Sequence, residues 1–101
     1  MNFVSLVGRL VKDPELFKTE NGKSVTTVTL AIPRGFKNMN GEYETDFIDC
    51  TLWENAATNT CEYCHKGETL CIRGRIGLHK KEIEDKSYRQ LEIIADKVTF
   101  L

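Results

Sequence analysis

The chain has 101 residues, enough for one domain with a single core, and its 41% hydrophobic and 29% charged residues are typical of a globular protein. No apolar run approaches the roughly 20 residues that a membrane-spanning helix needs. The N-terminal residues show no secretory signal, so we expect a cytoplasmic protein. The net charge of −1 argues mildly against a nucleic-acid-binding protein, but phosphate binding depends on the local field rather than on the total charge.

Strand signals dominate the first half of the chain. Gly8 suggests a bend in the first strand, and Pro14 ends that strand because proline cannot donate to a ladder. Asn21-Gly22 is typical of a hairpin turn. Pro33-Arg34-Gly35 breaks the second strand, and residues 36–45 are predicted to form a long hairpin loop. The three predicted strands cover residues 3–12, 23–32 and 46–54.

The second half contains one helix and two strands. A helix is predicted over residues 55–65 because Ala57, Cys61 and Cys64 form one apolar stripe, and Gly67 follows as a C-terminal cap. The order β-β-β-α-β-β predicts an all-β fold: a five-stranded antiparallel OB-fold barrel with one short helix, occupying residues 1–101 as a single domain. The remaining predictions are strands over residues 68–78 and 88–95, a polar loop over residues 79–87 and a short apolar tail.

The third predicted strand carries the functional signal. Side chains alternate along a strand, so Ile48, Cys50 and Leu52 share one face, whereas Phe47 and Trp53 share the other with Asp49. Burying an unpaired Asp49 would be costly, so the face with the two aromatic rings is predicted to point outward. Two large rings exposed together indicate a binding partner, although they could instead pack against a neighbouring subunit.

The fourth predicted strand adds positive charge. Arg73 and Arg75 alternate with a core-like face that contains Leu70, Ile76 and Leu78. Exposed rings together with exposed cations suit single-stranded nucleic acid, which offers flat bases and an anionic backbone. The loops extend this surface with Arg34, Phe36, Lys37, Lys80 and Lys81, whereas Tyr43 and Tyr88 are expected to be half-buried.

No catalytic, metal or cofactor site is expected. The Cys61–His65 segment matches the C-x-x-C-H pattern of haem attachment and contains half of a zinc site, but no second ligand pair accompanies it. Two small apolar residues on the buried face of a helix are the preferred interpretation. Glu82, Glu84 and Asp85 are interpreted as a solvated loop face. With no nucleophile and base arrangement, the protein is not expected to be an enzyme.

These residues resemble bacterial single-stranded DNA-binding protein (SSB). The resemblance begins with VSLVGRLVKDPEL at residues 4–16 and continues nearly to the end of the chain. It implies an OB-fold that coats single-stranded DNA without sequence preference in replication, recombination and repair, usually as a homotetramer, with a dimer also possible. By this resemblance the stacking rings are Phe36, Phe47 and Trp53, and the backbone contacts are Lys37, Lys66, Arg73, Arg75 and Lys80.

Two features depart from the SSB pattern. Lys81 stands where family members commonly carry a further aromatic residue, and the sequence stops at Leu101, where members continue into a flexible tail with an acidic tip. Either only the domain is present, or the chain is a short relative similar to tailless primosomal OB proteins or to a mobile-element variant. In an alternative function the exposed rings bind a protein in replication restart. Replacing Arg73 and Arg75 would then leave DNA binding unchanged.

Overall fold

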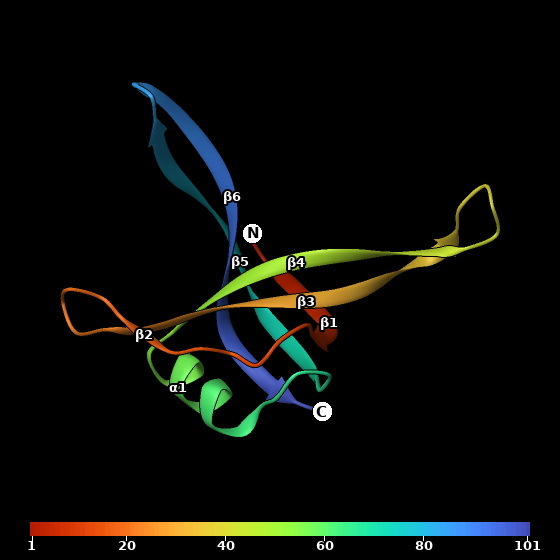
Figure 1. The fold of residues 1–101 in the computed structure, drawn as a ribbon, viewed down its shortest axis with the longest axis horizontal. Helices are drawn as coiled ribbons and strands as arrows, with labels where there is room; N and C mark the ends of the chain where they lie inside the picture. The colour runs from red at the N-terminus through yellow and green to blue at the C-terminus, as the bar shows by residue number, and fades with distance from the viewer.

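Five long strands close into a barrel in the computed structural model, which describes residues 1–101 (Figure 1). The elements are β1 (Val4–Leu10), β2 (Phe17–Lys18), β3 (Ser24–Lys37), β4 (Tyr43–Trp53), α1 (Glu54–Tyr63), β5 (Thr69–Ile83) and β6 (Lys86–Phe100). Neighbouring strands follow the order β1-β5-β6-β4-β3, and β3 pairs again with β1. The predicted OB-fold barrel is confirmed, except that β4 and β6 pair in parallel rather than antiparallel.

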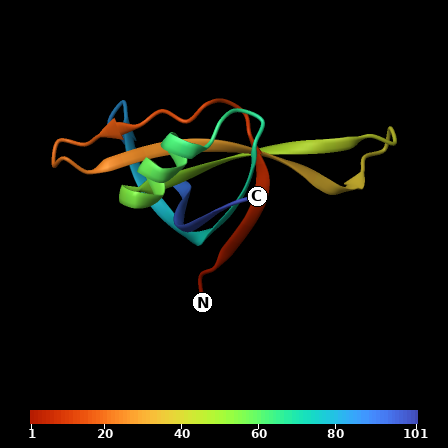
Figure 2. The same ribbon diagram turned by 90° about the horizontal axis from the view of Figure 1, so that it is seen from below.

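The core is built from alternate residues of the barrel strands. The side chains of Leu30, Leu52 and Ile72 are completely buried, because β-strands direct every second side chain to the same face. The ten-residue α1 packs against this core through Ala57 and Thr60 and lies beside one end of the barrel (Figure 2). No helix of the chain is long and apolar enough to cross a membrane.

Gly8 and Gly74 permit close approaches between barrel strands. A Cβ atom at Gly8 would lie 2.8 Å from the Ile32 side chain, at the point where β1 leaves β5 and meets β3. A Cβ atom at Gly74 would collide with the backbone carbonyl of Ile94, next to a register shift between β5 and β6. The bend expected at Gly8 therefore coincides with the closure of the barrel.

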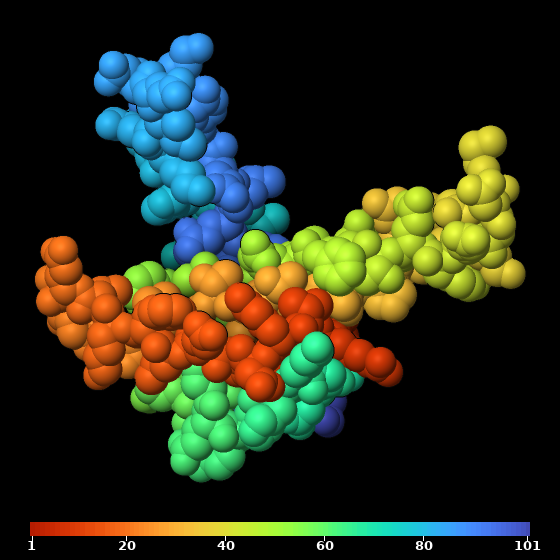
Figure 3. Space-filling model, viewed as in Figure 1, coloured from red at the N-terminus to blue at the C-terminus, as the bar shows by residue number.

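Two hairpin arms extend beyond the barrel. We call them the β3–β4 arm (residues 33–46) and the β5–β6 arm (residues 76–92), and Figures 1 and 3 show them projecting in different directions. The predicted break at Pro33 is wrong: β3 continues to Lys37, with a register shift that sets three residues of β3 opposite one of β4. A bulge of this kind bends a strand without ending it.

The loop predicted over residues 79–87 is also wrong, because both strands of the β5–β6 arm continue through it. The turn consists only of Glu84 and Asp85, whose φ angles of 51° and 64° are those of a two-residue hairpin. No glycine indicates this turn in the sequence. Ile76 and Leu78, predicted to lie in the core, are 42% and 61% exposed because the arm has left the barrel.

The helix differs from its prediction at the C-terminal end. It ends at Tyr63 with Cys64 as the cap, and Gly67, at a φ of 90°, belongs to the following turn. Cys61 is only half-buried, and Thr60 takes its place on the inner face. All four cysteines are free, and burial raises the pKa of the Cys50 thiol to about 11, so this thiol stays protonated at neutral pH.

Candidate nucleic-acid interface

The outer face of β4 carries the two aromatic rings singled out by the sequence. Phe47 is 65% exposed and Trp53 is 38% exposed, whereas Cys50 and Leu52 on the opposite face are completely buried. Asp49 also points outward, where its carboxylate accepts a hydrogen bond of 2.5 Å from the Thr29 hydroxyl on β3. The predicted orientation of this strand is confirmed.

Small side chains surround the rings on the neighbouring strand. Ala31 lies opposite Phe47, and Val25 lies opposite Trp53. The two residues are six positions apart along β4, a distance of about 20 Å at a rise of about 3.3 Å per residue. The outer face of β3 and β4 is therefore a shallow surface with a ring near each end.

Phe17 extends this surface, although the sequence analysis did not single it out. It pairs with Val25 in the short strand β2, and Val25 in turn pairs with Trp53, so the three side chains form one row across three strands. Phe17 is 58% exposed. The Asn21-Gly22 turn was the available signal, because a hairpin at that turn places the residues before it beside β3.

The β3–β4 arm carries a further exposed ring. Phe36 is 66% exposed and lies in the irregular part of β3. Next to it, the Lys37 ammonium lies 5.8 Å from the ring centroid of Tyr43, within the range of a cation–π contact. Tyr43 is 60% exposed, somewhat more than the half-burial expected of it, whereas Tyr88 on the other arm is 50% exposed, as expected.

Residues of the β5–β6 arm and of the outer face of β4 together line two hollows. One has a volume of about 320 Å³ and lies between Asp49 and Thr51 of β4 and the arm residues His79 and Lys81. The second, of the same volume, places Leu91 of the arm with Phe47. Leu91 lies in the strand predicted over residues 88–95, where no pattern singled it out. The arm thus brings a cation and an apolar side chain to the aromatic face.

The remaining predicted cations do not lie beside the aromatic face of β4. Arg73 and Arg75 are exposed on β5, which β6 separates from β4 in the sheet, and the Arg73 guanidinium lies 5.5 Å from the Phe3 ring centroid. Lys80 is exposed on the same arm as Lys81, but it does not line the hollow. Lys66 lies in the turn after α1. The predicted cations therefore lie on several elements around the barrel rather than on one strand.

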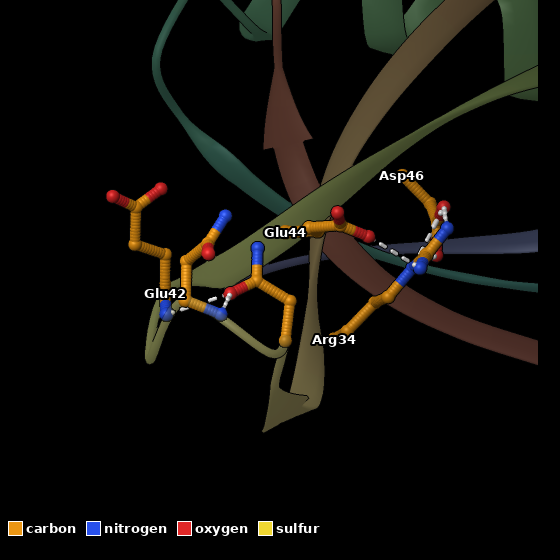
Figure 4. A network of polar contacts seen from close by, with 6 residues as sticks. Arg34, Glu42, Glu44 and Asp46 are labelled. Carbon is orange, nitrogen blue, oxygen red and sulfur yellow. Dashed lines mark hydrogen bonds and ion pairs between the residues drawn. The ribbon is translucent and has the colours of Figure 1, made fainter.

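Arg34 is held by two carboxylates of β4 (Figure 4). Its Nε and Nη2 atoms donate to Asp46 at 3.0–3.3 Å, and its Nη1 atom donates to Glu44 at 2.6 Å. The hydrogen bond from Arg34 is the main reason that the pKa of Asp46 is lowered. Asp46 therefore remains ionised, and paired with Arg34, throughout the neutral pH range.

A closed OB-fold barrel with an exposed aromatic face defines a class of small binding proteins. The comparison with known sequences then gives the family. Residues 1–101 match the single-strand binding protein family, and the chain belongs to that family.

Three curated relatives show the extent of the similarity. The chain is 46% identical over 101 residues to single-stranded DNA-binding protein B of Bacillus subtilis (strain 168), covering 99% of this chain and 89% of that protein. It is 45% identical to the single-stranded DNA-binding protein of Bacillus cereus and 46% identical to single-stranded DNA-binding protein 3 of Listeria innocua. Both alignments cover all of this chain, but only 60% and 64% of those proteins.

Proposed function

We propose that the protein binds single-stranded DNA, as the names of its relatives say of those proteins, and that it does so without sequence preference. The outward orientation of Phe47 and Trp53 is the observation that carries this proposal. Bases stack on exposed aromatic rings whatever the DNA sequence, and each stacked base contributes about 1–3 kcal/mol to the binding free energy. Phe36 and Phe17 extend the proposed stacking surface in two directions.

The proposed backbone contacts come from cations around the barrel. Lys81 is supported most directly, because it lies beside the aromatic face. A DNA strand that contacts both β4 and β5 must pass around the barrel, since β6 separates β5 from β4. The other proposed contacts are Arg34, Lys37, Lys66, Arg73, Arg75 and Lys80.

The proposed setting is the bacterial cytoplasm, where the protein coats DNA during replication, recombination and repair. We also propose a homo-oligomer, with a tetramer favoured over a dimer. The free edge of β1 supports this proposal, because residues 4–8 pair with β5 on one side and with no strand on the other. An unpaired strand edge flanked by the exposed Phe3 and Val7 can pair with a second chain.

Fluorescence titration with oligo-dT tests the stacking proposal, since Trp53 is the only tryptophan. We expect saturable quenching that added salt reverses. Phe47→Ala should weaken binding about 5- to 150-fold, the equivalent of about 1–3 kcal/mol for one lost stacked base.

Tyr63→Ala is the matched control, because this ring is 60% exposed but lies on α1. It should leave the affinity unchanged. If the tryptophan signal does not respond to oligo-dT at low salt, the proposal is overturned, and a protein partner on the aromatic face would be favoured.

A further inference from the structure

The Arg34 guanidinium is already occupied on the proposed DNA surface. All three of its nitrogen atoms donate to carboxylates, two to Asp46 and one to Glu44. A phosphate would use the same planar fork, because a guanidinium binds carboxylate and phosphate in the same bidentate geometry. Arg34 can therefore bind a phosphate through its Nε and Nη2 atoms only by releasing Asp46.

The charge of the β3–β4 arm strengthens this competition. The arm contains two cations, Arg34 and Lys37, and three anions, Glu42, Glu44 and Asp46. Its net charge is therefore −1 (two positive against three negative), although it carries the exposed Phe36 ring. A phosphate therefore approaches Arg34 against the repulsion of the arm's carboxylates.

The contact is nevertheless one that DNA can displace. The side chains of Arg34, Glu44 and Asp46 retain 40%, 50% and 45% of their exposure. Exposed ion pairs contribute little net stability, and salt screens them. A phosphate that arrives with a base stacked on the arm thus competes with a weak internal contact.

We propose that Glu44 and Asp46 act as internal competitors of DNA phosphate for Arg34, and so limit the affinity and salt dependence of DNA binding on the β3–β4 arm. This inference rests on the proposed function. It assigns to two acidic residues a role in setting DNA affinity, through the arginine that they hold.

The test measures the slope of log affinity against log salt for oligo-dT in a four-protein cycle. The proteins are the wild type, Arg34→Gln, the double variant Glu44→Gln/Asp46→Asn, and the triple variant. We expect Arg34→Gln to reduce the slope of the wild type only slightly, because Glu44 and Asp46 compete with phosphate for Arg34. In the double-variant background the same change should reduce the slope by about 0.7, the value for one phosphate contact on a single strand.

Glu42→Gln controls for the loss of negative charge alone, because no hydrogen bond or ion pair joins the Glu42 side chain to Arg34. In that background Arg34→Gln should again reduce the slope only slightly, as in the wild type. An equal effect of Arg34→Gln in the wild-type and double-variant backgrounds, or no effect in either, overturns the inference. Failure of the wild type to bind oligo-dT would instead overturn the proposed function, so the two failures are distinguishable.

Discussion

At the scale of single residues, Asp49 shows why the outer face of β4 could be predicted. A carboxylate is costly to bury without a partner, and Phe47 and Trp53 share its face by alternation. The structure places Asp49 outside, paired with Thr29 of the adjacent strand. The same logic could not identify the role of Arg34, because its partners Glu44 and Asp46 are ten and twelve residues away and meet it only through the hairpin.

Gly74 is a second residue whose importance depends on packing. The backbone of β6 approaches so closely that any Cβ atom at this position would meet the Ile94 carbonyl. In the sequence, Gly74 was only one small member of an apolar face. Its neighbours along the chain do not reveal that another strand lies against it.

Gly74→Ala should therefore destabilise the fold strongly. The backbone of β5 or β6 must move to relieve the collision, so we expect the free energy of unfolding to fall by at least about 2 kcal/mol. Urea denaturation followed by circular dichroism measures the change. Gly35→Ala is the control. Its free energy of unfolding should stay within about 0.5 kcal/mol of the wild type, because no atom lies near the added Cβ. Equal stabilities of the two variants would contradict the close approach at Gly74.

At the scale of elements, the strands consist of a barrel part and an arm part. The sequence pattern of β5 does not change where the strand leaves the barrel. Apolar alternation continues from Leu70 through Ile76 to Leu78, so the prediction extended the core too far along β5. Burial depends on which strands lie across the barrel, and none lies across an arm.

Leu70 and Leu78 lie on the same strand and test this division directly. Leu70→Ala should lower the free energy of unfolding by about 2–5 kcal/mol, because this side chain is 1% exposed. Leu78→Ala should lower the free energy of unfolding by less than about 1 kcal/mol, since 61% of this residue is already exposed. Urea denaturation at low protein concentration measures both. Similar losses would show that the β5–β6 arm is buried against another chain.

At the scale of the whole molecule, barrel closure leaves β3 between β1 and β4 on one side, and β5 and β6 between them on the other. The free edge of β1 and the aromatic face of β4 are then separate surfaces, and β1 can pair with a second chain while β4 remains open. Figure 2 shows the N-terminal end of β1 extending away from α1. One chain can thus support both oligomerisation and DNA binding.

Val7→Asp should weaken the proposed oligomer, because it places a charge beside the free edge of β1, where Val7 is 51% exposed. Sedimentation velocity over a range of protein concentrations should show the wild type as a multiple of 11.5 kDa and this variant shifted toward the monomer. Met39→Asp is the control. It adds the same charge at the tip of the β3–β4 arm and should leave the oligomer as in the wild type. A monomeric wild type at all concentrations would refute the oligomer.

The sequence by itself determined the number of barrel strands, the place of the helix and the outward face of β4. These properties follow from local rules: alternation along a strand, turn residues and the cost of burying a charge. The tertiary structure alone decided where the core ends along β5, that Phe17 joins the aromatic face, and that acidic residues hold Arg34. Each of these depends on contacts between residues that only the closed barrel and its hairpins bring together.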